Sequence, residues 1–411
     1  MKKKWIACFA AAVICANSGA IAVSAEEVDK NYNILALGDS ITAGVGVNDY
    51  SESYVSILSE YLENPIDNRA ESGMKSGELL SMVQSDSSVR DSIQNAEVIL
   101  VSIGANDIMS PILETEIVQE TDADGNPTKV FKVLNFNNPE EMLNSLDAKT
   151  RVKFQREITK AMPIAVATAN ENITAIAAEI KSLNSDADLI FQTVYDPLSI
   201  TNDTTTLSEN AISKINIMSS SMVYQYLNGS GENGTLIPIG LNSNIKDNEN
   251  IQTVDIYENL LCNAWYYTNL KDMDVHPNAI GHMVIAASIV NSGCLPRGNG
   301  EAFAKAYENS GAVNTLAEQD AKADALVKSI YPLGDVDGDG YISVDDASGV
   351  LTQYANHAAG NGDVLNVLAR FACDVDKNGE ISVDDASIIL EFYAKHAAGL
   401  VDSFDEFLSS K

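Results

Sequence analysis

Residues 32–295 alternate short, nearly continuous apolar runs with longer amphipathic stretches, and this alternation restricts the possible fold more than any other feature of the chain. Four apolar runs are predicted to be strands: 33–37, 98–103, 189–194 and 253–256. Val55, Leu58 and Leu62 follow helical spacing, and residues 158–183 are long and helix-like. Apolar runs without polar alternation are typical of parallel strands covered on both faces. The sequence therefore predicts an α/β domain, a three-layer αβα sandwich.

The first 25 residues have the pattern of an export signal. Lysines at 2–4 precede a mostly apolar segment, and the small residues 23–25 come directly before Glu26. A membrane anchor is the alternative, but residues 17–19 (Asn-Ser-Gly) interrupt the run and leave it short of a full span. No later stretch is apolar enough to cross a membrane. The sequence thus predicts a signal peptide at 1–25 and a secreted, extracellular protein.

The charge balance is strongly acidic, with a formal net charge of −32. Without residues 1–25, 23 basic residues stand against 58 acidic ones. Because such a surface repels phosphate, nucleic acid is not predicted as a partner. The chain has four histidines and no Gly-rich phosphate loop, which excludes histidine-rich metal catalysis and nucleotide chemistry. The length indicates two or three domains.

Candidate catalytic groups lie at the carboxyl ends of predicted strands or in the loops after them, where open α/β sheets place their sites. Ser40 follows the first strand, at a predicted strand-to-helix junction. Gly73 lies in a loop, and its N–H can approach a substrate closely. Asn106 follows strand 98–103 and can donate to a developing oxyanion. His276 follows acidic residues, which can orient its ring as a base for a serine. Each group alone also has an ordinary explanation, as a helix cap, a turn residue or a solvated loop histidine.

Together and in this order, these segments resemble the SGNH (GDSL-type) hydrolase family. The resemblance covers residues 32–295, and its four blocks are Gly38-Asp39-Ser40-Ile41, Gly73, Gly104-x-Asn106-Asp107 and the stretch before His276-Pro277. It implies a flavodoxin-like sandwich and an ester hydrolase that needs no cofactor for catalysis. It also implies Ser40 as nucleophile, His276 as base, and an oxyanion hole built from the N–H groups of Ser40 and Gly73 and from Asn106.

The last block departs from the family pattern, in which an acid stands three residues before the histidine. Met273 occupies that position here, with Asp274 two residues before His276 and Asp272 four before. Either carboxylate could orient His276, or a backbone carbonyl could do so. We favour Asp274. His282 is interpreted as a residue near a helix start rather than as the base.

The C-terminal part contains a repeat with a period of 39 residues. Segments 335–360 and 374–399 are identical at 18 of 26 positions, and each opens with acidic residues at the spacing of a calcium loop. The predicted oxygen ligands of two calcium ions are Asp335, Asp337, Asp339, Tyr341 (by its carbonyl) and Asp346, then Asp374, Asp376, Asn378, Glu380 and Asp385. Ser343 and Ser382 can contribute at position 9, directly or through water. Apolar residues at helical spacing follow each loop.

These two loop–helix units resemble a type I dockerin, over residues 333–403. The resemblance implies a small all-α module, folded by structural calcium, that binds a cohesin on a scaffoldin. The family's specificity pairs would be Val344-Asp345 and Val383-Asp384, and their identity predicts a nearly two-fold symmetric module. Residues 296–332 lie between the two domains and are interpreted as a semi-rigid, partly helical spacer.

Two further features concern loops and cysteines. Residues 120–132 are interpreted as an inserted hairpin near the active-site edge, which could shape substrate access. Cys262 and Cys294 could form a disulfide or stay as thiols, and Cys373 is interpreted as a small packed residue.

The resulting hypothesis is a secreted serine esterase tethered to a cellulosome-like complex. The dockerin context favours ester groups on plant cell-wall polysaccharide, such as acetyl groups on xylan. The alternatives are a lipase or lysophospholipase, since one scaffold can serve several acyl substrates, and a catalytically inactive binding module.

Overall fold

The structure is a computed structural model, and it describes residues 32–411 except 125, 133–147, 198, 200–222, 230–236, 238, 262 and 273. The predicted signal peptide, residues 1–25, lies outside the described residues. Among the described residues, no helix combines the length and the apolar character that crossing a membrane requires.

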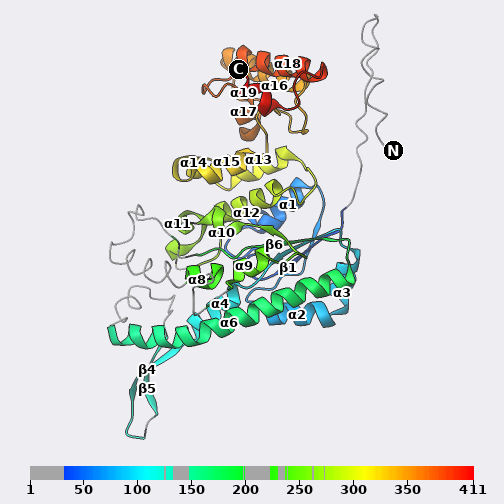
Figure 1. Ribbon diagram of the computed structural model, residues 1–411. Coiled ribbons are helices and arrows are strands. Elements are labelled where there is room, and N and C mark those ends of the chain that lie inside the picture. Colours follow the sequence, from blue (N-terminus) through cyan, green and yellow to red (C-terminus); the bar gives the residue numbers. More distant parts are fainter. Residues whose placement is uncertain are drawn as a thin grey trace, which may run out of the picture. The chain divides into compact units, whose positions relative to one another are not determined.

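A parallel five-stranded sheet forms the centre of the first domain (Figure 1). Its order is β2-β1-β3-β6-β7, with β1 at Ile34–Gly38, β2 at Ile66–Asn68, β3 at Val98–Ser102, β6 at Asp188–Gln192 and β7 at Gln252–Val254. This is the flavodoxin-like order, in which the chain changes direction across the sheet between its first and third strands. Four strands occur where the sequence predicts them. The short β2, which is partly exposed, carries no apolar run and was not predicted.

Helices cover both faces of the sheet, because alternate residues of the buried strands point to opposite sides. Leu35 and Ile99 pack with the face formed by α2 (Ser76–Ser85), α3 (Ser87–Asn95), α4 (Ala105–Glu114), α6 (Ala148–Leu183), α8 (Tyr224–Asn228) and α9 (Leu241–Lys246). Ile34 and Leu100 pack with the face formed by α1 (Tyr54–Tyr61), α10 (Ile256–Leu260), α11 (Ala264–Tyr267) and α12 (Ala279–Asn291). Because both faces of the sheet pack against apolar helix surfaces, its buried strands appear in the sequence as continuous apolar runs.

Residues 300–328 form three helices, α13 (Gly300–Asn309), α14 (Ala312–Gln319) and α15 (Ala321–Lys328). They do not behave as a spacer, because Phe303, Tyr307, Leu316 and Val327 are buried in the same core as α1 and α12. Phe303 meets the ring of Tyr61 edge-on, with 5.8 Å between centroids. The predicted spacer is therefore an added helical layer on the hydrolase domain, and its alanine content reflects helix packing.

A two-stranded antiparallel hairpin follows α4, with β4 at Glu116–Thr121 and β5 at Pro127–Lys132. The sequence predicts a hairpin at 120–132, and the observed one begins four residues earlier. In its turn, Asp122 Oδ1 accepts hydrogen bonds from the N–H groups of Asp124 and Asn126.

The C-terminal residues form a helical module with α16 (Val344–Ala358), α17 (Val367–Cys373), α18 (Val383–Ala397) and α19 (Phe404–Ser409). The repeated helices α16 and α18 pack against each other. Cys373 is buried, as predicted. Cys294 is a free thiol, so the possible bridge to Cys262 is not formed; the side chain of Cys262 lies outside the described residues.

Candidate active site

Ser40 lies in a tight turn directly after β1. Gly38 precedes it with φ = +136°, and a Cβ at Gly38 would lie 2.0 Å from the Ser102 carbonyl oxygen on β3, so this close approach of two strands requires glycine. The sequence predicts a helix start at this point. Instead, residues 39–46 form successive turns, and α1 begins only at Tyr54. The turn presents the Ser40 hydroxyl to the segment that holds His276.

The structure brings Ser40, His276 and Asp274 together in a hydrogen-bonded series. Ser40 Oγ lies 2.9 Å from His276 Nε2, and His276 Nδ1 lies 2.5 Å from Asp274 Oδ1. Asp272 ends the short 3-10 helix η3 (Leu270–Asp272) with an exposed side chain, and none of the described hydrogen bonds joins it to His276. This is the arrangement in which a carboxylate orients imidazole as the base for a serine nucleophile.

An Asx turn explains how an acid two residues before the histidine can reach it. Asp274 Oδ1 accepts a hydrogen bond from the backbone N–H of His276 at 3.1 Å, and the same oxygen contacts Nδ1. Backbone bonds from Asn269 to the His276 carbonyl and from Asp274 to the Asn269 carbonyl close the loop. The Tyr195 hydroxyl donates to the Val275 carbonyl at 2.6 Å and so anchors the loop to the sheet.

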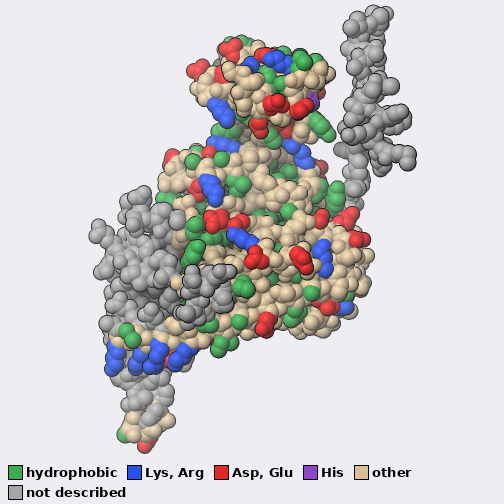
Figure 2. Space-filling view, in the orientation of Figure 1, with side chains coloured by type: hydrophobic (Ala, Val, Ile, Leu, Met, Phe, Trp, Pro, Cys, Tyr) green, Lys and Arg blue, Asp and Glu red, His purple; other side chains and the backbone are tan. Residues whose placement is uncertain are grey.

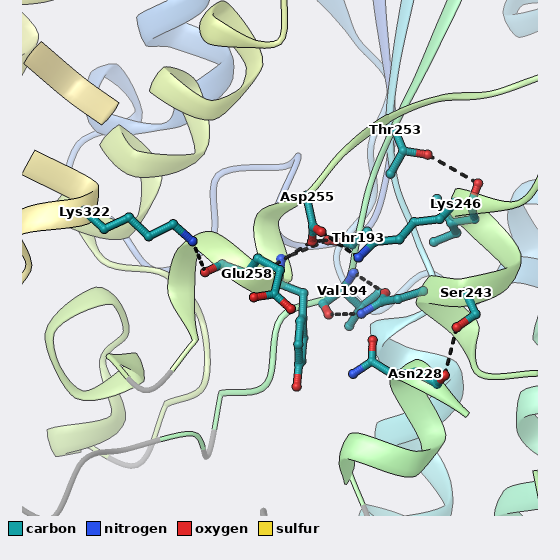
Figure 3. A network of polar contacts seen from close by, with 12 residues as sticks. Thr193, Val194, Asn228, Ser243, Lys246, Thr253, Asp255, Glu258 and Lys322 are labelled. Carbon is teal, nitrogen blue, oxygen red and sulfur yellow. Dashed lines mark hydrogen bonds and ion pairs between the residues drawn. The ribbon is translucent and has the colours of Figure 1, made fainter. Parts of the chain in front are cut away.

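A network of polar contacts holds Thr193 and Val194, the two residues directly after β6 (Figure 3). Tyr195 follows them in the chain. Asp255 accepts hydrogen bonds from Thr193 Oγ1 and the Glu258 N–H, and it pairs with Lys246 at 2.5 Å. Val194 exchanges two hydrogen bonds with the Asn242 side chain. Because both the N–H and the carbonyl of Val194 are hydrogen-bonded, the next residue, Tyr195, has a defined position facing the catalytic loop.

The two predicted oxyanion-hole blocks are joined to each other. Gly73 has φ = +83° and open space where a Cβ would lie. Asn106, in the first turn of α4, donates its side-chain N–H to the Met74 carbonyl at 3.0 Å. Asp107 accepts from both the N–H and the hydroxyl of Ser76, which fixes the end of the glycine loop on α4. The roles of Gly73 and Asn106 in binding an oxyanion remain predictions.

A buried chain of hydroxyl groups supports the nucleophile turn. Ser102 Oγ donates to Asp39 Oδ1 at 2.8 Å, so its single hydrogen is used. Thr42 must then donate to Ser102, and Tyr54 to Thr42, over 2.6 Å and 2.7 Å. Asp39 accepts at the end of this chain. Burial raises the pKa of its carboxyl to about 6, although the hydrogen bond from Ser102 opposes the shift.

Behind the turn lies a cavity of about 10 Å³, lined by Asp39, Ser102 and Gln192 among others, with room for about one water molecule. His282 is fully buried in α12 and accepts the Tyr54 backbone N–H through Nδ1. Burial lowers the pKa of His282 to about 4, so it is a neutral structural residue, in agreement with the sequence analysis.

We expect Asp274→Asn to lower kcat by about 10²- to 10⁴-fold, because the asparagine cannot hold His276 in the required tautomer. Asp272→Asn is the matched control, since it makes the same chemical change two residues away on an exposed side chain. Steady-state hydrolysis of p-nitrophenyl acetate measures both. Near-normal rates in both variants would mean that no carboxylate acts on His276 and that a backbone carbonyl orients it.

The repeated acidic loops of the C-terminal module have the donors and geometry for calcium. One carboxylate oxygen each from Asp335, Asp337 and Asp346 lies within 4.8 Å of the others, and the equivalent set in the second loop is Asp374, Asp376 and Asp385. Asp335 Oδ1 is buried without a hydrogen-bond partner. Burial raises the pKa values of all three acids of the first loop, and neighbouring carboxylates add to the effect. An orphaned oxygen among crowded carboxylates fits a hard cation.

The remaining predicted ligands occupy the same loops. Asp339 accepts the Tyr341 N–H at 2.7 Å, and Asn378 accepts the Glu380 N–H at 2.7 Å, so the two loops turn in the same way. Gly340 and Gly379 have φ of +92° and +87°, as the sixth position of such a loop requires.

The fold and the Ser–His–Asp arrangement define a serine hydrolase. Residues 36–221 match the model of the GDSL-like Lipase/Acylhydrolase family, a match that ends before His276. This part of the protein therefore resembles the GDSL-type acylhydrolases, and the protein is a carboxylic ester hydrolase.

The chain is also similar to solved structures. These include a lipase from a goat rumen metagenome (17% identity, TM-score 0.38, covering 63% of this chain and 96% of that one) and an extracellular lipase from Streptomyces rimosus (14%, 0.37, 61% and 94%). A third is phospholipase A1 from Streptomyces albidoflavus (15%, 0.38, 63% and 98%). No curated protein matches the chain significantly. Because identities and TM-scores are low, the assignment rests on the family match and the site geometry.

Several supporting residues were not predicted from sequence. Tyr195, Ser102, Thr42 and Tyr54 act through hydrogen bonds to residues 12 to 80 positions away, and no local pattern identifies such partners. Arg297, which supports the first acidic loop rather than the active site, was also not predicted. Its Nε donates to the Gly338 carbonyl at 2.9 Å and its guanidinium pairs with Asp335 in the first acidic loop.

Proposed function

We propose that this protein is a secreted esterase that removes acetyl groups from plant cell-wall polysaccharide while a calcium-loaded dockerin holds it on a scaffoldin. The hydrogen-bonded Ser40–His276–Asp274 series carries the catalytic part of the proposal. The C-terminal module carries the tethering part, and the polymer substrate follows from the combination of the two.

In the proposed mechanism each catalytic group has one role. His276 Nε2 takes the proton from Ser40 Oγ as the oxygen attacks the ester carbonyl, and a covalent acyl-serine forms as the alcohol leaves with that proton. Water then attacks the acyl-serine with His276 again as base, which releases the acid and restores Ser40. Asp274 stabilises the imidazolium in both steps. The Ser40 and Gly73 N–H groups and Asn106 bind the oxyanion.

The C-terminal module supports the tethering part through two equivalent apolar surfaces. Val344, Leu351 and Tyr354 on α16 are 46, 40 and 40% exposed, and their counterparts Val383, Leu390 and Tyr393 on α18 are 47, 40 and 42% exposed. Such matched exposure of apolar side chains on a small module indicates two alternative docking faces. The partner that fits them is a cohesin, which would meet either face after rotation by about 180°.

Calcium would be held by Asp335, Asp337, Asp339, the Tyr341 carbonyl and Asp346, and by the equivalent residues of the second loop. When bound, it would neutralise the carboxylates and link each loop to the helix that follows. Asp346 and Asp385 already join loop to helix: each lies in the first turn of its helix and accepts backbone N–H groups from the loop before it, Val336 and Ser343 in the first unit and Val375 and Ser382 in the second.

The substrate is tested by comparing acetate release from acetylated xylan with hydrolysis of p-nitrophenyl esters of increasing chain length. We expect acetate release from the polymer and a rate that falls steeply beyond short acyl chains. Preference for long-chain esters, with no acetate released from xylan, would identify an acyl-lipid hydrolase and contradict the proposal.

A further inference from the structure

The amino-terminal half of α6 carries a concentration of positive charge on an otherwise acidic protein. Residues 149–160 include five basic residues and a single acid, Glu157, whereas the whole chain has a net charge of −32. Lys149, Arg156 and Lys160 are exposed and Lys153 is half-exposed. Glu157 pairs with both Arg156 at 3.0 Å and Lys160 at 3.2 Å, and the segment has four more basic than acidic residues. Figure 2 shows basic side chains gathered over this end of the helix.

The four basic residues Lys149, Lys153, Arg156 and Lys160 form one stripe, which we call the α6 stripe. At 3.6 residues per turn they fall within about 60° of the helix circumference and span about 16 Å along its axis. Two exposed apolar side chains, Val152 and Ile164, flank them at 67 and 69% exposure. From Ile158 onward, the opposite side of the helix is buried in the core, through Ile158, Met162 and Val166.

The topology places the α6 stripe at the active-site end of the sheet. The carboxyl end of α6 leads through a short connection into β6, and Asn184 there donates to the carbonyls of Ile93 and Ala96, just before β3 begins. The carboxyl end of α6 therefore lies where the strands begin, and its amino-terminal half lies where they end, as Ser40 does. With 36 residues, about 54 Å, α6 extends well beyond the sheet, beside the β4–β5 hairpin (Figure 1).

We propose that the α6 stripe binds the carboxylate-bearing part of an anionic polysaccharide substrate, such as a chain containing uronic acids. The inference rests on the proposed function and names its substrate class more closely. A single line of cations complements a linear polyanion. A planar anionic membrane fits less well, because it would face not only the stripe but a wider area of a protein whose net charge is −32, and like charges within a Debye length, about 8 Å, repel. The flanking apolar residues are two aliphatic side chains, without the aromatic anchors typical of an interfacial helix.

Binding is tested on the Ser40→Ala protein, so that no substrate is consumed. Isothermal titration calorimetry would compare polygalacturonate with an uncharged glucan at about 50 and about 200 mM NaCl. We expect the Ser40→Ala protein with an intact α6 stripe to bind polygalacturonate and not the glucan. This binding should be weaker at the higher salt concentration. The triple reversal Lys149→Glu, Arg156→Glu, Lys160→Glu should weaken binding at least about tenfold, since attraction becomes repulsion.

A matched control makes the same change in net charge elsewhere, by Lys305→Glu, Lys395→Glu and Lys411→Glu. Lys395 and Lys411 both pair with Glu391 at the surface, at 2.8 and 3.0 Å, and exposed pairs of this kind contribute little to stability. We expect binding to change less than about twofold. Equal loss in both triple variants would overturn the proposal, because it would show an effect of net charge alone. Binding to phosphatidylserine vesicles as tight as binding to polygalacturonate would overturn it in favour of a membrane surface.

Activity separates this inference from the proposed function. In the active protein, the α6 reversal should lower kcat/KM about tenfold on an acetylated uronic-acid polysaccharide and leave p-nitrophenyl acetate hydrolysis unchanged. If acetate is released from neutral and acidic polymers alike, and the reversal does not change these rates, only the inference about the α6 stripe is overturned. Failure to release acetate from any polysaccharide would overturn the proposed function, and with it the substrate role of the stripe.

Discussion

Ser40→Ala is expected to lower kcat for p-nitrophenyl acetate by about 10⁵-fold or more, because the covalent route is lost with the hydroxyl. His276 Nε2, 2.9 Å from Ser40 Oγ, would then have no serine to activate. Residual rate would come from oxyanion binding alone. The fold should remain, since Ser40 Oγ makes no other described hydrogen bond and the glycine at 38, which the turn needs, is unchanged.

The control for this substitution is Ser88→Ala, which removes an exposed hydroxyl at the start of α3. Circular dichroism and thermal melting should be the same for both variants and the parent protein. Mass spectrometry after brief exposure to an active ester should detect an acyl group on the parent and the Ser88→Ala protein but not on Ser40→Ala. A folded Ser40→Ala protein with normal turnover would refute the mechanism.

The core of the fold could be predicted because its strands are buried on both faces. Residues 34–37 face two different helical layers in alternation, so every position is apolar. The alternation of apolar and polar residues that marks a half-exposed strand is therefore missing. The three-residue β2 is exposed on one side and lacks this pattern. The helical layer at 300–328 was interpreted as a spacer because small residues are compatible with both a linker and close helix packing.

The site could be predicted only as far as local sequence determines it. Ser40 and His276 are 236 residues apart, and family resemblance alone related them before the structure did. The choice of Asp274 over Asp272 depends on an Asx turn, in which the spacing of two residues places one oxygen against both the N–H and the ring of His276. A helix start after Ser40 was predicted wrongly because Gly44 and Gly46, both with positive φ, continue the turns instead.

We propose that calcium determines whether the C-terminal module folds, so that its removal should separate the two parts of the protein. Without the ion, each loop brings carboxylates together, and their repulsion opposes folding. Asp335, Asp337 and Asp346 of the first loop have pKa values raised above 3.8. Between pH 3.8 and these raised pKa values, the folded module therefore binds more protons than the unfolded one. The stability of the calcium-free module should therefore fall as pH rises through this range, and mild acid should partly restore it.

In EDTA at neutral pH, we expect the calorimetric transition of the C-terminal module to be lost while p-nitrophenyl acetate hydrolysis continues, because the Ser40–His276–Asp274 series contains no comparable group of oxygens. Asp385→Ala should remove one of two calcium sites, since Asp385 is fully buried at position 12 of its loop. The matched Asp384→Ala changes an exposed neighbour and should keep both sites. Loss of esterase activity in EDTA, or an unchanged calorimetric transition, would show that calcium does not divide the protein in this way.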